Sequence, residues 1–156
     1  MKKSLLIIFT AILFSCHSPN KTSILGAELE FKPGENNSIE SVSPKHSDYM
    51  LVFEDNGETG YLYVLAIDHA ENPIVDAMHV YNVDSISDKT INSHYRIVWT
   101  QDGTKGALFI NDYCHALVDF TEQGAYNRNG FPPAEKNGWV KKGHDWDESK
   151  LSLFKL

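Results

Sequence analysis

Histidines near carboxylates are the residues of this chain most able to bind a metal ion or transfer protons. His115 and Asp119 would share one face of a predicted strand. His144 and Asp147 form a second pair, and His79 is a third candidate. A zinc-type site needs three or four converging ligands, and neither His-x-x-x-His nor Cys-x-x-Cys occurs. We therefore predict no metal and no cofactor. An envelope hydrolase or metal-dependent enzyme that uses these two pairs remains the alternative.

Nucleophilic catalysis finds no support in the sequence. Gly-x-Ser-x-Gly is absent, and Cys114 and His115 are neighbours in a predicted strand, so their side chains would point to opposite faces. A pair of carboxylates could still act as in a glycosidase, but their separation decides that chemistry. We predict no catalytic residues and favour a protein that is not an enzyme.

An acidic stretch at a predicted hairpin contains Glu54, Asp55 and Glu58, whose oxygens would suit a hard cation or a basic ligand. It lacks the twelve-residue loop ending in Glu that marks a calcium hand. Asp-Asn-Gly is also the sequence that a tight turn selects, and we favour the turn.

Aromatic residues and Arg128 accumulate in the segment after residue 120. Trp146 and Arg128 are typical interface anchors, which makes this segment a candidate binding surface. Large aromatic side chains are more often buried, so we favour the alternative that Phe131, Trp139 and Trp146 cover one face of the sheet.

Charge and length restrict the partners. The 156 residues suffice for one ordinary domain, and 21 acidic residues against 14 basic ones give a net charge of −7. A nucleic-acid partner is disfavoured because such proteins present a basic face. An acidic surface instead favours a basic protein partner.

The first residues have the pattern of an export signal. Lys2 and Lys3 precede an apolar run that is shorter than the roughly 20 residues of a membrane span. Leu-Phe-Ser-Cys at 13–16 resembles the bacterial lipoprotein box, which implies cleavage before Cys16 and its lipidation. We expect a signal peptide over 1–15, a lipidated tether over 16–23, and one β-rich domain over 24–156. The expected location is the cell envelope, anchored by the lipid in the bilayer of the outer membrane and facing the periplasm or the surface.

The remaining pattern predicts a mainly β protein, with α+β as the alternative. Short connections force antiparallel neighbours, which predicts a single meander sheet of about five to six strands. We expect the strand at 60–67 to be central and covered on both faces, and 32–48 to be an exposed loop. A loop-rich segment follows residue 121, with a short helix over 147–154 capped by Asp145 or Asp147. The other expected strands are 24–31, 49–54, 74–83, 95–100, 105–110 and 113–120.

Several fragments resemble an uncharacterised bacterial family known only as a domain of unknown function. They include Phe53-Glu-Asp-Asn-Gly-Glu-Thr-Gly-Tyr61, Trp99-Thr-Gln-Asp-Gly103, His115-Ala-Leu-Val-Asp-Phe120 and His144-Asp-Trp-Asp147. The resemblance covers about residues 50–147. It implies membership of a family and no particular activity.

These observations favour an anchored protein-binding module of the envelope, such as an inhibitor or an immunity protein. A purely structural envelope lipoprotein is the other alternative, and it predicts neither a ligand nor a tight partner.

Overall fold

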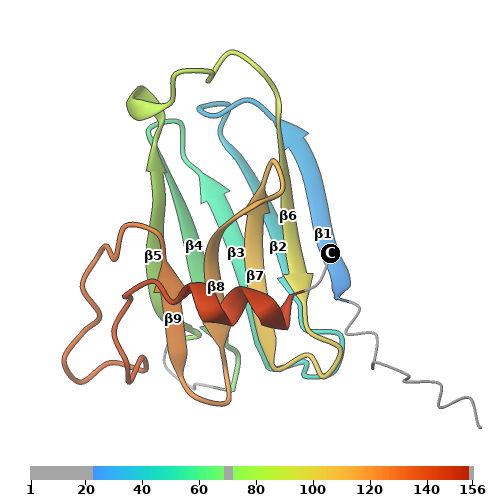
Figure 1. Ribbon diagram of the computed structural model, residues 1–156, viewed down its shortest axis with the longest axis vertical. Helices are drawn as coiled ribbons and strands as arrows, with labels where there is room; N and C mark the ends of the chain where they lie inside the picture. The colour runs from blue at the N-terminus through green and yellow to red at the C-terminus, as the bar shows by residue number, and fades with distance from the viewer. Residues whose placement is uncertain (1–22, 69–71, 155–156) are drawn as a thin grey trace, which may run out of the picture.

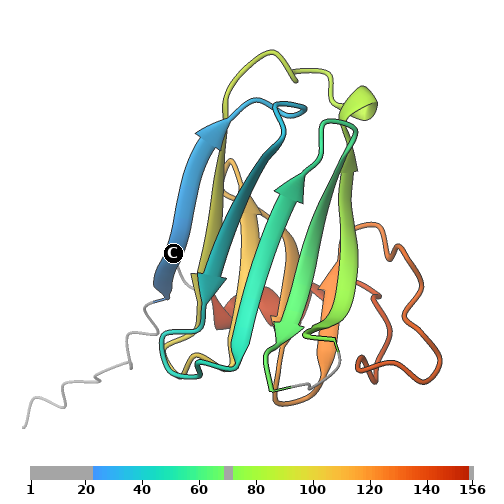
Figure 2. The ribbon, with the colours of Figure 1, turned by 180° about the vertical axis from the view of Figure 1, so that it is seen from behind.

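Two antiparallel sheets pack face to face in the computed structural model, which describes residues 23–68 and 72–154 (Figures 1 and 2). The signal peptide predicted for 1–15 and Cys16 lie outside these residues. In the described part of the chain, no helix has the length and apolar character needed to cross a membrane. The elements are β1 (Ile24–Phe31), β2 (Asn37–Val42), β3 (Tyr49–Asp55), β4 (Thr59–Ala66), β5 (Ile74–Asn82), the 3₁₀ helix η1 (Val83–Ser85), β6 (Ser93–Trp99), β7 (Lys105–Ile110), β8 (Tyr113–Asp119), β9 (Gly124–Asn127) and the 3₁₀ helix η2 (Glu148–Leu153).

The strand order explains why one predicted sheet is in fact two. One sheet has the order β1-β6-β7-β8-β9 and the other has the order β2-β3-β4-β5. The chain changes sheet after β1 and again after β5, so β1 pairs with β6 and not with its neighbour in sequence. The mainly β, antiparallel fold is confirmed, and the single meander is wrong. The expected loop at 32–48 is also wrong because it contains β2, an edge strand with few apolar side chains.

The core between the sheets is aromatic at one end. The Phe31 and Tyr95 rings stack with centroids 3.9 Å apart, and Phe53 lies 5.2 Å from Tyr95. Toward the opposite end, where β6 finishes, the buried indole of Trp99 donates a 2.9 Å hydrogen bond to the Ser41 hydroxyl on the facing sheet. Each large side chain buried here contributes about 1.5–3 kcal/mol relative to an exposed position.

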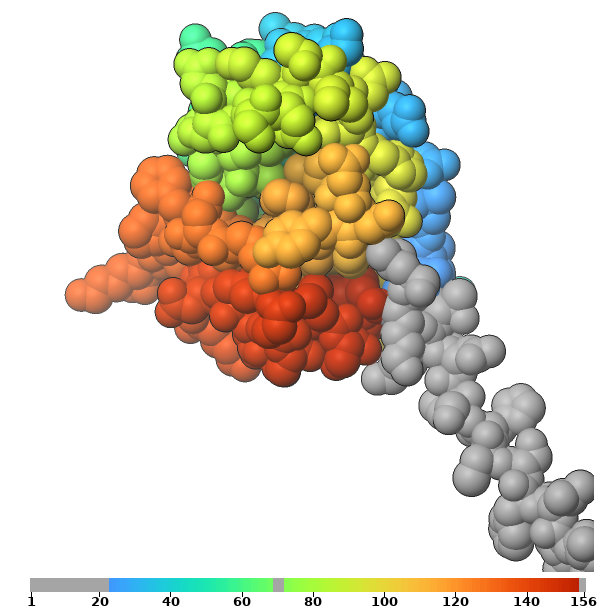
Figure 3. Space-filling view, turned by 45° about the horizontal axis from the view of Figure 1, so that its top comes forward, coloured from blue at the N-terminus to red at the C-terminus, as the bar shows by residue number. Residues whose placement is uncertain are grey.

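The outer face of the five-stranded sheet is covered by the end of the chain. Phe154, Leu151 and Trp146 pack on a second apolar cluster that includes Leu117 and Tyr126 of this sheet. Figure 1 shows η2 crossing over β7 and β8, and Figure 3 shows the C-terminal residues as a continuous band on this side. The predicted role of the tail as a cover therefore holds for Trp146.

The outer face of the four-stranded sheet has no such cover among the described residues (Figure 2). Side chains of β4 alternate between buried and half-exposed, and Tyr61, Tyr63 and Leu65 are on the half-exposed side. Our expectation that β4 is covered on both faces is wrong. Because the residues on the open side are tyrosine and leucine, the sequence of β4 resembles that of a strand buried on both faces.

Candidate functional site

A row of four aromatic rings crosses the open face of the four-stranded sheet. The centroids of Tyr63 and Tyr61 lie 6.2 Å apart, and those of Tyr61 and His79 lie 5.3 Å apart. Phe131 completes the row at 5.9 Å from His79, and 52% of its surface is exposed. We call these four residues the aromatic row. They place aromatic area, partly open to solvent, on one side of the molecule.

Strand register and edge contacts hold the aromatic row together. Tyr61 is the cross-strand partner of His79, which brings the two rings to the same face. The His79 amide donates to the Phe131 carbonyl at 2.9 Å, so the segment after β9 is fixed to the β5 edge. The His79 ring accepts from the Asn129 amide at 2.7 Å and donates to Asn82 Oδ1 at 3.0 Å. Both ring nitrogens are therefore used in positioning.

The charge around the aromatic row is negative. Strands β2 to β5 contain no lysine and no arginine, whereas Glu40 and Glu54 are exposed on them. Glu54 is the cross-strand neighbour of Tyr61, beside which it projects from the open face. Burial, followed by the charge of Glu54 and a hydrogen bond to it, raises the pKa of Tyr63 above its ordinary value. The open face thus combines aromatic rings with carboxylates.

The other two acidic hairpin residues are placed differently. Asp55 is 1% exposed and accepts hydrogen bonds from the Gly34 amide at 2.7 Å, the Gly57 amide at 2.8 Å and the Tyr81 hydroxyl at 2.6 Å. Glu58 is exposed in the turn. Asp55 thereby fixes the turn, which is the interpretation the sequence favoured, and its carboxylate is already used.

His115 and Asp119 do not share a strand face. A register shift in the β7–β8 ladder pairs Leu108 with Ala116 but Phe109 with Cys114, so His115 is the extra residue of a β-bulge. The His115 ring lines a small pocket at one end of the sandwich together with Tyr81 and Tyr95. Burial, and next the nearby Arg128, lowers the pKa of His115 to about 4.

Asp119 is the last residue of β8. Its carboxylate lies 3.2 Å from Lys105 Nζ and accepts from the Thr121 hydroxyl at 2.6 Å. Burial works against its charged form, but the hydrogen bonds from Thr121 and Glu122 and the Lys105 charge hold the pKa of Asp119 below its usual range. Asp119 is therefore a paired structural carboxylate.

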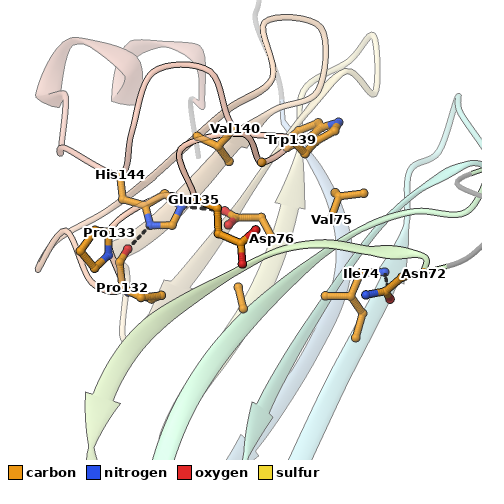
Figure 4. A pocket seen from close by; sticks show the side chains of 12 residues that line it. Asn72, Ile74, Val75, Asp76, Pro132, Pro133, Glu135, Trp139, Val140 and His144 are labelled. Atoms are coloured by element: carbon orange, nitrogen blue, oxygen red, sulfur yellow. Dashed lines mark hydrogen bonds and ion pairs between the residues drawn. The ribbon is translucent and has the colours of Figure 1, made fainter.

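His144 lies against the edge of β5, in the wall of a pocket (Figure 4). Its Nε2 is 2.8 Å from Asp76 Oδ2, and its Nδ1 donates to the Pro132 carbonyl oxygen. Because both partners are acceptors, both ring nitrogens must carry protons, which describes an imidazolium. Burial lowers the pKa of His144, yet the hydrogen bond and charge of Asp76 outweigh it, and the net shift is upward. No ring nitrogen is left to act as a base.

Asp147 and His144 have different hydrogen-bond partners and do not act as a pair. The Asp147 carboxylate accepts from the Ser149 amide at 3.0 Å and caps η2, which confirms one of the two predicted caps. The structure therefore does not bring the His115, Asp119, His144 and Asp147 side chains into one site. No group of three or more histidine, cysteine, aspartate or glutamate side chains that could hold a metal occurs in residues 23–68 and 72–154.

Arg128 and Trp146 belong to the covered side of the molecule. The guanidinium carbon of Arg128 lies 3.7 Å from the Trp146 ring centroid and 4.4 Å from that of Tyr113. Arg128 also pairs with Glu148 at 2.8 Å and donates to the Cys114 carbonyl at 3.0 Å. These contacts fasten the C-terminal segment to β8. Cys114 is buried beneath this segment, and burial raises the pKa of its thiol to about 12.

The pocket beside His144 has a volume of about 320 Å³, and it includes two carboxylates, Asp76 and Glu135, that are not among the candidate residues of the sequence analysis. Asp76 comes from β5, and Glu135 and Trp139 come from the loop that follows Phe131. Figure 4 shows Glu135 and Asp76 pointing into the same space. Neither Asp76 nor Glu135 belongs to a local sequence motif. The two residues are recognised as neighbours only because the loop lies against β5 in the structure. The alternation of Tyr61 and Tyr63 along β4 was visible, but it was interpreted as burial on both faces.

The chain is similar to a bacterial protein family and to an individual bacterial protein. A family described as an uncharacterized protein conserved in bacteria (DUF2251) matches residues 31–155. An uncharacterized protein of Haemophilus influenzae is 37% identical over 119 residues, which cover 76% of this chain and 74% of that protein. No solved structure matches the chain.

Proposed function

This chain belongs to the bacterial DUF2251 family, and we propose that it is a lipid-anchored envelope protein whose open sheet face binds a basic protein partner. Binding of this kind is what an inhibitor or an immunity protein performs. The lipid anchor is inferred from the signal-like residues that end at Cys16.

The aromatic row on the open face is the observation that carries the proposal. Tyrosine is among the residues that contribute most at protein interfaces, because it buries a large, rigid ring and keeps a polar hydroxyl. The opposite sheet buries its outer face beneath the chain's own C-terminal segment, whereas Tyr61, Tyr63 and Phe131 keep part of their surface in solvent. A partner would supply the missing cover.

Charge supports a basic partner over an acidic one. Because strands β2 to β5 carry glutamates and no lysine or arginine, an acidic partner would meet like charge at this surface. The overall charge of −7 adds a long-range attraction for a cationic protein and accelerates its capture.

The geometry favours binding over hydrolysis. His144 uses both ring nitrogens, Asp119 is paired with Lys105, and Asp147 caps η2. A purely structural lipoprotein would have no use for a partly exposed aromatic row, so the two functions differ in whether this face captures a partner.

Photo-crosslinking from the open face tests the proposal in intact envelopes. A benzophenone amino acid replaces Tyr61, and the control carries it at Ile91, a more accessible position that is 64% exposed in the loop before β6. We expect one basic protein to crosslink in stoichiometric amounts at position 61 and not at position 91. Equal labelling from both positions, or none at position 61, would overturn the proposal.

The anchor is tested separately by mass spectrometry of the protein from native cells. A diacylglyceryl thioether on Cys16 and loss of residues 1–15 are expected. An intact Met1 with an unmodified Cys16 thiol would contradict the envelope location.

A further inference from the structure

The pocket between β5 and the loop at 132–144 is lined by residue types that can bind a positively charged side chain. We propose that it binds the cationic head of an arginine or lysine residue, presented by the basic partner on the open face. This inference rests on the proposed function for the identity of the partner. The chemistry of the pocket can be tested without that partner.

The charge of the pocket is the first argument. Asp76 and Glu135 point into it, and no lysine or arginine is among the described residues that line it. The imidazolium of His144 balances the charge of Asp76 at 2.8 Å, which leaves the Glu135 carboxylate without a cation in the lining. Lys141 donates to the carbonyl oxygen of the lining residue Gly138 but is not itself among the residues that line the pocket. A cationic group would complete this arrangement.

The walls suit the rest of a long basic side chain. Trp139 offers an aromatic ring, on which a guanidinium or ammonium group is attracted to the π-electron face. Ile74, Val75 and Pro133 form apolar walls that can contact the methylene groups of the same side chain. A small anion or a purely apolar ligand would use only part of this surface.

The edge of β5 supplies acceptors as well. The His79 amide and carbonyl groups point away from β4, because they bond to Phe131 and to the Asn127 side chain. Strand geometry repeats every two residues, and no register shift lies between them, so the amide and carbonyl of Ala77 point the same way. Ala77 lines the pocket, and its carbonyl oxygen can therefore accept from a bound cation.

The pocket adjoins the aromatic row. Ala77 is the cross-strand partner of Tyr63, and Ile74 is the partner of Leu65, so residues of the open face also line the pocket. A protein that packs on Tyr63 would place a basic side chain within reach of Glu135. One partner surface could then occupy both features.

A titration with capped amino acids tests the pocket. N-acetyl-arginine amide and N-acetyl-lysine amide are added to the folded chain, and the indole N–H signal of Trp139 is followed by NMR. N-acetyl-citrulline amide is the control, because it has nearly the shape of arginine without the charge. We expect saturable shifts with dissociation constants on the order of millimolar for a cationic ligand of this size, and none with citrulline. Larger shifts with arginine than with lysine would assign the site to a guanidinium, and the reverse to an ammonium.

Two variants locate the binding. Glu135→Gln should weaken the cationic ligand by about threefold to fivefold, the range expected for a solvent-exposed carboxylate. Glu30→Gln, which removes an exposed carboxylate on β1, should leave the affinity unchanged. Equal shifts with citrulline and arginine, or equal effects of the two variants, would overturn the cation site.

The outcome is separable from that of the crosslinking experiment. If position 61 captures no partner while arginine still shifts Trp139, the proposed function fails and the cation site stands. If a basic partner is captured and Glu135→Gln binds it as tightly as the unaltered chain, the cation site fails and the proposed function stands.

Discussion

The two sheets differ in what lies on their outer faces. The five-stranded sheet buries Leu117 and Tyr126 under the chain's own C-terminal segment, and the four-stranded sheet leaves Tyr61 and Tyr63 half-exposed. Both faces carry large apolar side chains, so strand composition alone does not separate them. The difference comes from a distant segment, residues 146–154, whose apolar side chains pack on the five-stranded sheet only. An apolar sheet face that the chain does not cover itself is a surface where binding can occur.

The same substitution on each face gives the sharpest test of this contrast. Leu117→Ala removes a side chain that is 1% exposed and should lower the free energy of unfolding by about 2–5 kcal/mol. Leu65→Ala on the open face should lower it by less than about 1 kcal/mol. Urea unfolding of both variants measures the two values. Similar losses would show that the open face is buried in the folded protein in solution.

Breaking the ion pair between His144 and Asp76, which joins the loop at 132–144 to β5, should have the next largest effect on stability. Asp76→Asn leaves the buried His144 ring without its charged partner and should cost about 2 kcal/mol. This is less than the about 3–5 kcal/mol lost with a fully buried pair, because asparagine keeps an acceptor oxygen. The same unfolding experiment measures it. Asp48→Asn, which alters a half-exposed carboxylate in the loop before β3, should be nearly neutral.

The same pair predicts a pH dependence with a definite sign. The pKa of His144 is raised in the folded protein, although burial opposes the charged form, because Asp76, the Pro132 carbonyl and Asp145 favour it. Its contribution to stability is therefore complete below the unfolded pKa of about 6.5 and is lost as pH rises through the raised folded pKa. Unfolding measured between pH 6 and 9 should show this decline in the unaltered chain, and a smaller one in Asp76→Asn. The absence of any difference would contradict the ion pair.

Arg128→Gln should loosen the cover on the other sheet by a smaller amount. The change removes the contacts of the guanidinium with the Trp146 and Tyr113 rings, and it removes the ion pair with the largely exposed Glu148. We expect the free energy of unfolding to fall by about 1 kcal/mol. Tryptophan fluorescence should also shift to longer wavelength as Trp146 gains water. Arg128→Lys keeps the charge but not the planar group, and should recover only part of the loss.

Glu54→Gln on the open face should have the smallest effect on stability, within about 0.5 kcal/mol, because the side chain is exposed. If the open face binds a basic partner, the same change should slow association and weaken its dependence on salt. Glu30→Gln is the matched control on the other sheet. An unchanged association rate in Glu54→Gln would remove the electrostatic part of the proposal.

Local chemistry made some of this structure predictable from the sequence. The turn at 55–57 was predicted because Asp55 and Gly57 suit its backbone, and Gly57 does adopt a φ of 92°. The cap at Asp147 was predicted for the same reason: its side chain acts on an amide two residues away.

Features that depend on distant contacts were missed. No local pattern signals that β1 pairs with β6, so two sheets were taken for one. The β-bulge at His115 inverted the expected face of that side chain, and a bulge leaves no mark in a strand-like run of residues. Of the candidate residues, Glu54 and His79 lie on the open face, and His144 lies at the pocket.

The pairing of β1 with β6 also has a kinetic consequence. Strands β2 to β5 are joined by short turns and can associate as soon as they are synthesised, because closing a short loop costs little entropy. β1 has to wait for a strand that begins at Ser93, after the whole four-stranded sheet has left the ribosome. Its amide protons should then gain protection from hydrogen exchange later in refolding than those of β2 to β5.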